Sequence, residues 1–338
     1  MPRRGLISIL VLLAIILCAF LALYFGYFLI SPAGSAKNEE IFMVKKGSSL
    51  RKVAAELEER ELIKSKDLFM MWAYLRGGAR DIKAGEYGLT PLMAPAKIFN
   101  ILTSGAVKTH PFTIPEGLTA DQIADLLSKR NLVNKRDFTY LANDENLAAS
   151  FHIDGNSLEG YLFPDTYLIS RDMGAKDLVE LMVHRFWDVF NALVKDKNTS
   201  MSVREIVTLA SIVEKETGLA AERPFIASVF LNRLKKRMRL ESDPTVIYGL
   251  KDFDGNLKRK DLRTPNPYNT YIHHGLPPGP IANPGRESLM AVINPADTDY
   301  LYFVSKNDGS HFFSSSLQEH NKAVYKYQKS RLSLSGNE

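Results

Sequence analysis

Two glutamates near the end of one segment of periodic apolar residues could perform acid–base chemistry. They are Glu214 and Glu216, in the run VREIVTLASIVEKETG. A protonated carboxyl can give a proton to a leaving group, and the resulting carboxylate can accept one in a later step. Partial burial and the negative end of a helix dipole both raise a carboxyl pKa toward neutrality, which suits this role. The alternative is an ordinary surface Glu-Lys-Glu triplet, which would have the same local pattern.

The segment around these glutamates predicts a helix with defined ends. Ser202 can accept a hydrogen bond from a backbone N–H while Glu205 reaches back to it, which makes a capping box. Gly218 stands where a left-handed C-cap is expected, and Pro224 suits the first turn of the next helix. Between these ends, apolar residues recur with helical spacing, namely Val203, Ile206, Val207, Leu209, Ala210, Ile212 and Val213.

Helix geometry separates the two glutamates. At about 100° per residue, the side chains of Glu214 and Glu216 point about 200° apart. They therefore cannot act as a facing acid–nucleophile pair. If one of them is catalytic, the other is structural, and helix geometry alone does not say which.

Several motifs follow one another along the chain: EGYLFPDTY, ASIVEKET, ERPFIASVFLNRL, SDPTVIYG, TPNPYNTYIHHGLPPGPIANPG and YLYFVSKNDGSHFFSSSLQEHN. Together they resemble the signature of the YceG-like endolytic murein transglycosylases. The resemblance covers nearly all of the chain after its N-terminal apolar segment. In that family the second glutamate of the EKE triplet is the catalytic acid. The resemblance therefore implies that Glu216 is catalytic and that Glu214 is structural.

The resemblance also implies a substrate and a reaction. The substrate is the peptidoglycan glycan strand, cut within nascent strands between N-acetylmuramic acid and N-acetylglucosamine. Glu216 would act first as acid and then as base, and the muramoyl C6 hydroxyl would close a 1,6-anhydro ring. No cofactor or metal is implied, and a partnership with wall-synthesising enzymes is a family expectation.

Polar and aromatic residues near the motifs are candidates for binding this substrate. Between residues 264 and 285 the chain is rich in proline and glycine, and it carries tyrosines beside an amide. Aromatic faces stack on sugar rings while amides bond their hydroxyls. The alternative is a rigid loop whose tyrosines plug a core edge, with Asn232 as a cap. The substrate-binding candidates are Glu159, Asn232, Asp243, Tyr248, Tyr268, Asn269 and Tyr271.

Two other functions fit the same residues. A hydrolytic muramidase would need a second carboxylate to activate water, and Glu159, Asp165 or Asp243 could supply it. A non-enzymatic, membrane-tethered wall-binding or assembly protein would need no catalytic acid. The products of digestion distinguish the first, and the effect of Glu216→Gln distinguishes the second.

The N-terminus predicts a membrane anchor. Residues 6–30 contain no charged side chain, and Arg3 and Arg4 precede them. A helix of this length spans roughly 37 Å, which exceeds the roughly 30 Å of bilayer hydrocarbon. The positive-inside rule then leaves residues 1–5 in the cytoplasm and exports the rest. The alternative is a cleaved signal peptide with a site near Gly34. With the resemblance, we expect a single-pass protein of the bacterial inner membrane whose catalytic domain faces the periplasm and cell wall.

Charge and cysteine content exclude other classes of function. The net charge of +5 is mild and lacks clustered basic-aromatic motifs, so we expect no nucleic-acid partner. Cys18 lies inside the apolar segment, so the exported part can form no disulfide and no thiolate metal site. His273 and His274 are adjacent and have no zinc-spaced partner, so we expect no metal.

A repeat with a constant offset of 70 residues organises the first half of the exported part. Residues 42–69 align with 112–139, pairing Gly47 with Gly117 and Leu57 with Leu127, which predicts a duplicated strand–helix–helix module. The first copy is LysM-like by the resemblance, whereas the second is expected to be a packing unit. We expect an α+β fold divided into an anchor at 6–30, a linker at 31–40, the LysM-like module at 41–106, the second repeat at 107–150 and a mixed α+β catalytic domain at 151–338.

Local patterns also predict several elements after the central helix. Residues 246–248 are expected to form a short strand because they are branched and aromatic. Asn283 is expected to cap a helix over 286–293. A hairpin is predicted around Asn307-Asp308-Gly309, followed by a helix over 317–331.

Overall fold

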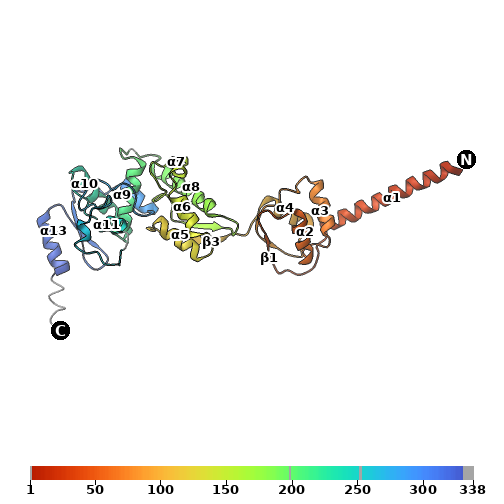
Figure 1. The fold of residues 1–338 in the computed structure, drawn as a ribbon, viewed down its shortest axis with the longest axis horizontal. Coiled ribbons are helices and arrows are strands. Elements are labelled where there is room, and N and C mark those ends of the chain that lie inside the picture. The colour runs from red at the N-terminus through yellow and green to blue at the C-terminus, as the bar shows by residue number, and fades with distance from the viewer. Residues whose placement is uncertain (1, 198, 251–252, 330–338) are drawn as a thin grey trace, which may run out of the picture. The chain divides into compact units, whose positions relative to one another are not determined.

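The computed structural model describes residues 2–197, 199–250 and 253–329 (Figure 1). The chain divides into two compact units. The first comprises Met1–Phe112 with Leu168–Asp172, and the second comprises Thr113–Tyr167 with Met173–Glu338. The predicted α+β content is present, because short two-stranded sheets accompany the helices in the described part of the chain.

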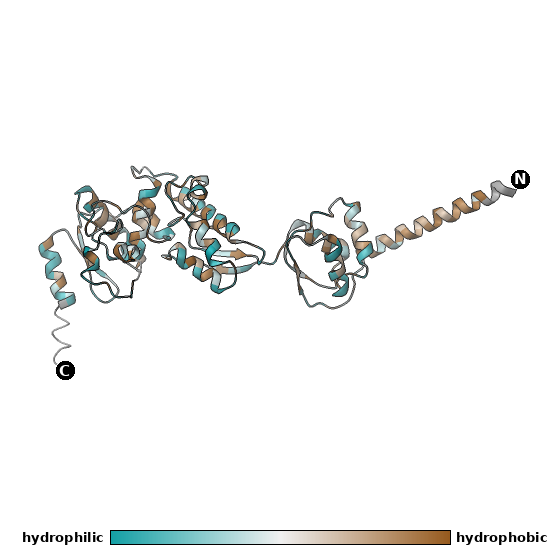
Figure 2. Ribbon diagram, viewed as in Figure 1, coloured by the Kyte–Doolittle hydropathy of each residue, from teal (hydrophilic) through white to brown (hydrophobic). Residues whose placement is uncertain are grey.

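The chain begins with one long apolar helix, α1 (Pro2–Ile30). Its segment Ile7–Ile30 has a mean hydropathy of 3.0 and could cross a membrane by length and composition. Figure 2 shows hydrophobic residues along most of this helix. Large side chains such as Leu12 and Phe20 are exposed on it, which is what a helix surrounded by lipid requires.

The first unit is built around one antiparallel strand pair. Strand β1 (Glu40–Val44) pairs with β2 (Gly85–Leu89), and Phe42 lies opposite Tyr87. Three helices cover this pair, and both aromatic side chains are buried together with Leu57, Phe69 and Leu102. The helices are α2 (Leu50–Glu59), α3 (Lys66–Leu75) and α4 (Pro95–Ser104).

The strand–helix–helix order of the first unit recurs 70 residues later. Gly47 and Gly117 both have a positive φ, of 79° and 74°, and so do Glu61 and Asn131, at 56° and 55°. The same turns therefore begin and end the equivalent helices. The later elements are β3 (His110–Thr113), α5 (Ala120–Lys129) and α6 (Lys135–Ala142). From Thr113 onward, this second copy belongs to the same compact unit as the segment after residue 172.

A layer of helices forms the centre of the second unit. Helix α9 (Val203–Glu216) packs against α10 (Arg223–Lys235) and α12 (Arg286–Ile293), and α12 also packs against α8 (Ala175–Val194). Side chains of α9 from Ile206 to Val213 are buried, which confirms the predicted apolar helix with its capping box at Ser202. Between α6 and this layer lie α7 (Glu145–Ser150) and β4 (Thr166–Ile169), and β4 pairs with β3. The layer comprises α8 (Ala175–Val194), α9 (Val203–Glu216), α10 (Arg223–Lys235) and α12 (Arg286–Ile293).

The C-terminal part of the second unit contains the predicted hairpin. Strand β5 (Tyr302–Ser305) pairs antiparallel with β6 (His311–Ser314), and Asn307 and Gly309 adopt positive φ in the connection. Helix α13 (Leu317–Val324) follows and continues as a π-helical turn over Tyr325–Lys329. The last two residues of the predicted terminal helix, 330 and 331, lie outside the described part of the chain.

Three local predictions were wrong. The segment predicted as a strand is helix α11 (Asp243–Gly249), because Pro244 in its first turn starts a helix that outweighs the branched residues after it. Gly218 is not left-handed, since α9 ends at Thr217 in an extended conformation. The N-cap of α12 is Gly285 rather than Asn283, whose side chain is buried between other segments.

Candidate active site

Glu216 occupies one wall of a cavity of about 280 Å³ in the second unit. It is the last residue of α9, and its Oε1 accepts a hydrogen bond of 2.5 Å from the Ser242 hydroxyl just before α11. The other residues that line this cavity come from α10, the loop before α11, the first turn of α11, the proline-rich loop and the C-terminal hairpin and helix. They are Arg233, Leu240, Glu241, Asp243, Tyr271, Phe303 and His320.

The surroundings of Glu216 favour a protonated carboxyl. Burial is the main cause that raises its pKa, and the nearby charge of Asp243 raises it further. The hydrogen bond from Ser242 and the charge of Arg233 lower it, so that the pKa of Glu216 lies at about 7. A carboxyl with this pKa is populated in both protonation states near neutral pH, as an acid that later serves as base requires.

Glu214 points to a different side of α9. Its carboxylate accepts a hydrogen bond of 2.9 Å from Arg223 Nη2 and another of 2.9 Å from the backbone N–H of Gly285. Arg223 also lies 3.3 Å from Glu116, and its side chain is almost fully buried. The expectation that the two glutamates face apart is confirmed, and the contacts of Glu214 fix the last turn of α9.

Asp243 and Tyr271, which also line the cavity, form a hydrogen-bonded pair. The Tyr271 hydroxyl donates to Asp243 Oδ1 at 2.6 Å. Burial and the neighbouring Asp243 raise the pKa of Tyr271 well above its usual value, so this hydroxyl stays a donor. Two of the predicted substrate-binding residues therefore share one cavity with Glu216.

Arg233 brings a positive charge to the cavity, and hydrogen bonds to backbone carbonyls hold its guanidinium in place. Its Nε donates to the Leu301 carbonyl at 2.7 Å and its Nη1 to the Leu240 carbonyl at 2.9 Å. Its guanidinium also stacks over the Tyr302 ring at 5.3 Å. A cation held in this way moderates the pKa of Glu216 without forming a direct ion pair with it.

Tyr248 and Tyr268 line a different hollow, of about 310 Å³. Their ring centroids are 4.8 Å apart. Tyr248 is near the end of α11, whereas Asp243 is its first residue. The predicted tyrosines therefore divide between two hollows, one at each end of this short helix.

Two of the predicted substrate-binding residues have internal hydrogen-bond partners. Asn269 is fully buried, and its Nδ2 donates to the Leu262 and Thr264 carbonyls while its Oδ1 accepts from the Tyr271 N–H. Asn232 donates from Nδ2 to the carbonyls of Thr298 and Tyr300 at 2.8 and 3.1 Å. Buried backbone carbonyls that have no partner within a helix or strand need hydrogen-bond donors. The side-chain amides of Asn269 and Asn232 serve as these donors.

Glu159 is also internal rather than exposed to a ligand. Both of its carboxylate oxygens lie 3.1 Å from the Ala120 N–H, and Oε1 accepts from Asn283 Nδ2 at 3.0 Å. The Tyr248 hydroxyl is 3.4 Å away. Burial raises the pKa of Glu159 to about 7. Asp165, another carboxylate considered from the sequence, is bound to Arg185 at 2.7 Å and does not line the Glu216 cavity.

The sequence analysis missed Ser242, which contacts Glu216, and several of the residues that line the cavity. Ser242 directly precedes Asp243 in the motif SDPTVIYG, and this adjacency is the signal that could have identified it. Phe303 and His320 lie within the motif YLYFVSKNDGSHFFSSSLQEHN, but nothing in its local pattern places them in the same cavity as Glu216. Only the packing of the hairpin and α13 beside α10 brings them to the cavity.

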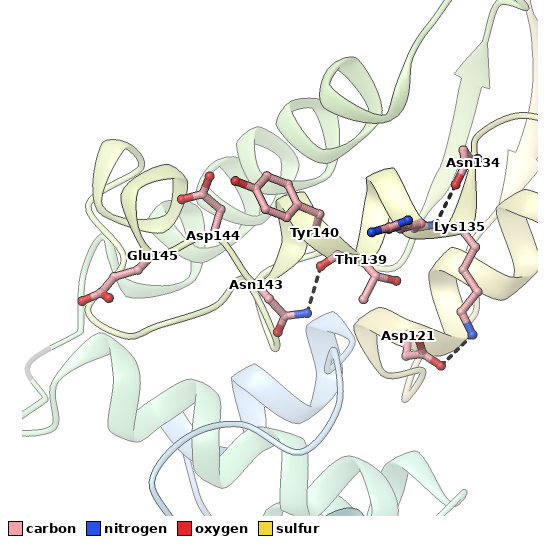
Figure 3. Close-up of a pocket in the computed structure, with 9 residues that line it drawn as sticks. Asp121, Asn134, Lys135, Thr139, Tyr140, Asn143, Asp144 and Glu145 are labelled. Carbon is pink, nitrogen blue, oxygen red and sulfur yellow. Dashed lines mark hydrogen bonds and ion pairs between the residues drawn. The ribbon is translucent and has the colours of Figure 1, made fainter.

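A larger open hollow, of about 860 Å³, lies over the second repeat. Figure 3 shows the Lys135 ammonium directed at Asp121, while the Tyr140 ring points away from this pair. Lys135 also pairs with Asp125 at 2.8 Å. The two aspartates that face Lys135, Asp121 and Asp125, are therefore exposed and ion-paired.

Comparisons with known proteins agree on one family. A family model described as YceG-like matches residues 42–326. An endolytic murein transglycosylase of Bacillus subtilis (strain 168) is 36% identical over 328 residues, covering 92% of this chain and 91% of the relative. One from Streptococcus pneumoniae (strain ATCC BAA-255 / R6) is 29% identical, covering 98% of this chain and 66% of the relative.

A solved structure supports the same grouping. The 2.6 Å crystal structure of a YceG-like protein from Listeria monocytogenes has a TM-score of 0.58 and 36% sequence identity to this chain. The match covers 85% of this chain and 99% of that structure. The two proteins are therefore similar in sequence as well as in fold.

Proposed function

This chain belongs to the YceG-like family, and we propose on that basis that it is a peptidoglycan lytic transglycosylase that cuts within glycan strands at Glu216. The observation that carries the proposal is that the Glu216 carboxyl lines a cavity and has a pKa of about 7. The substrate class is inferred from similarity to named murein transglycosylases. The choice of Glu216 as the acid is supported by its position in the cavity and its raised pKa.

The proposed reaction uses Glu216 twice. Protonated Glu216 gives its proton to the oxygen that links N-acetylmuramic acid C1 to N-acetylglucosamine, and the C1–O bond breaks. The acetamido oxygen of the muramoyl residue meets the positive charge that develops at C1. The Glu216 carboxylate then accepts the proton of the C6 hydroxyl, whose oxygen bonds to C1. The product carries a 1,6-anhydro ring, Glu216 is protonated again, and no water is consumed.

The neighbours of Glu216 suit each step. Because Ser242 donates to Oε1, the transferable proton belongs on Oε2. The Asp243 carboxylate provides negative charge in the same cavity, where it favours a cationic sugar carbon. The Phe303 ring offers an apolar face against which a sugar can lie.

The test is digestion of purified peptidoglycan by the full-length protein in detergent, with products identified by mass. Wild type should produce anhydromuramoyl ends, and Glu216→Gln should lower their rate by about 10²–10⁴-fold because the general acid is lost. Glu287→Gln, at an exposed residue of α12, is the matched control and should be unaffected. Anhydro ends formed at the wild-type rate by Glu216→Gln would refute the proposal.

A muramidase is the second candidate, because Asp243 shares the cavity with Glu216. In that reaction Asp243 would activate a water molecule, and the products would carry reducing ends. Digestion in ¹⁸O-water separates the two reactions, since only hydrolysis places the heavy oxygen at the muramoyl C1.

We further propose that α1 anchors the protein in the bacterial cell membrane. Arg3 and Arg4 before the apolar segment favour a cytoplasmic N-terminus, and the rest then faces the periplasm and cell wall. The first unit is proposed to be a LysM-like wall-binding module, and wall-synthesising enzymes are proposed partners. Protease treatment of spheroplasts tests the orientation, because only an exported catalytic unit would be digested.

A further inference from the structure

The second hollow, lined by Tyr248 and Tyr268, contains a positively charged side chain that the proposed reaction does not use. Arg204, in the first turn of α9, lines this hollow of about 310 Å³ together with Asp154, Asn156 and Ser157. Most of these groups are polar, and the aromatic residues Tyr161, Tyr248 and Tyr268 also line the hollow. Such a combination is typical of a site for a polar ligand with an apolar face.

The position of the Arg204 guanidinium is set from one side only. Its Nη2 donates to the Pro278 carbonyl at 2.5 Å, which orients the planar group. Its Nη1 is 3.7 Å from Asp154 Oδ1, and the Asp154 side chain is 91% exposed. An exposed pair at this distance contributes little, so a ligand carboxylate can replace Asp154. A guanidinium binds carboxylates in a two-bond geometry that an ammonium does not provide.

The Arg204 hollow lies along the same elements as the Glu216 cavity. Arg204 and Glu216 are twelve residues apart on α9, which corresponds to about 18 Å along a helix. Helix α11 connects the two hollows, with Asp243 in one and Tyr248 in the other. A ligand that occupied both would have to extend well beyond one sugar ring.

We propose that the Arg204 hollow is a carboxylate-binding subsite for the acidic groups of the glycan strand held at Glu216. This proposal rests on the proposed function, since it names what a second part of the same substrate does. Peptidoglycan offers the required carboxylate from two sources. One is the peptide stem, and the other is the muramoyl lactyl group, whose carboxylate is free where the stem has been removed. The rings of Tyr248 and Tyr268 line the same hollow as the guanidinium.

A distal anchor of this kind explains how a strand is cut internally. A carboxylate bound about 18 Å from the acid requires that the strand, or a stem attached to it, continue beyond the bond that breaks. Binding at Arg204 contributes equally before and during the chemical step, so it lowers KM and leaves kcat nearly unchanged.

The experiment measures anhydro-end formation by the full-length protein on two substrates, each with free or methylamide-blocked carboxyls. The substrates are uncross-linked strands with stems and the same strands stripped by an amidase. Blocking should lower the wild-type kcat/KM by about tenfold, which is the loss of one charge-assisted pair. Arg204→Gln should lower kcat/KM by the same factor on the free substrate and be insensitive to blocking. An effect confined to stem-bearing strands identifies the stem carboxylate, and one confined to stripped strands identifies the lactyl group.

Two further variants act as controls. Asp154→Asn removes the competing carboxylate, so kcat/KM on the free substrate should rise. Arg130→Gln, at the exposed C-cap of α5, should behave as wild type. The proposal is overturned if blocking slows wild type and Arg204→Gln equally, or slows neither.

Binding separates a failure of the subsite from a failure of the proposed function. Labelled strands are titrated into Glu216→Gln protein, with and without Arg204→Gln, and followed by fluorescence anisotropy. An approximately tenfold weaker affinity for free but not blocked strands supports the subsite even if no variant forms anhydro ends. Equal affinities for free and blocked strands would overturn it whatever the products are.

Discussion

Glu214 and Glu216, two residues apart at the end of α9, form hydrogen bonds with different segments of the second unit. Glu214 is held by Arg223 and the Gly285 N–H, whereas Glu216 accepts a hydrogen bond from Ser242 and faces a cavity. The Glu214 carboxylate is paired with the buried Arg223 cation, whereas burial raises the pKa of Glu216 to about 7. The helix thus separates a structural acid from a reactive one.

Ser242→Ala should move the alkaline limb of the pH profile upward. The Ser242 hydrogen bond lowers the pKa of Glu216, so its removal raises that pKa. Because Glu216 must be protonated for the first step, activity falls as the pH rises through this pKa, and the variant should stay active to higher pH. The dependence of kcat/KM on pH measures the shift. An unchanged or lower limb would contradict the assignment of Glu216 as the acid.

Asp243→Asn should move the same limb in the opposite direction. The charge of Asp243 raises the pKa of Glu216, so its loss lets the carboxyl ionise at lower pH. The maximal rate should also fall by roughly 10–100-fold, because negative charge near the cationic sugar carbon is lost. If both variants shifted the limb in one direction, the titrating group would not be Glu216.

Glu214→Ala should destabilise the second unit by about 3 kcal/mol, because it leaves the buried Arg223 cation without its closest partner. Glu116 still lies 3.3 Å from Arg223 and limits the loss. Urea unfolding monitored for the second unit provides the measurement. Glu56→Ala, at a partly exposed pair with Arg60 in the first unit, is the control and should cost less than about 1 kcal/mol. If both variants lost a similar unfolding free energy, the buried Glu214–Arg223 pair would contribute no more to stability than an exposed pair.

Glu159 should make stability fall as the pH rises toward neutrality. Its pKa is about 7 in the folded protein and 4.5 without the fold, so the folded state binds the extra proton between these values. The stability from this group is full below pH 4.5 and is lost by about 1.4 kcal/mol per pH unit up to pH 7. Glu159→Gln should remove this slope.

The measurement for Glu159 is the difference in unfolding free energy between variant and wild type at several pH values. A constant offset is expected as well, since the amide of Gln would meet the Ala120 N–H and Asn283 donors. The pH dependence of this difference tests whether Glu159 is protonated in the folded protein. Its pH-independent part tests the contacts with the Ala120 N–H and Asn283. A difference independent of pH would show that Glu159 is already ionised in the folded protein.

Much of the fold could be predicted because its causes are local. The capping box at Ser202 and the apolar spacing of α9 lie within a few residues of one another, so the helix and its N-terminus followed directly. The repeat was visible because equivalent turns need the same residues, as at Gly47 and Gly117. Val246–Tyr248 was mispredicted because branched residues favour a strand on average, whereas Pro244 determines the local start of a helix.

The sequence by itself determined that Glu214 and Glu216 point apart, because about 100° per residue is a property of any α-helix. It also marked, by resemblance, which of the two is the acid. The tertiary structure decided what surrounds that acid. Ser242, Phe303 and His320 reach Glu216 from distant segments, and Asn269 turned inward because buried backbone carbonyls needed its amide. Burial is a property of the packed molecule rather than of a motif, so only the packing of α9 and its neighbours raises the pKa of Glu216 to about 7.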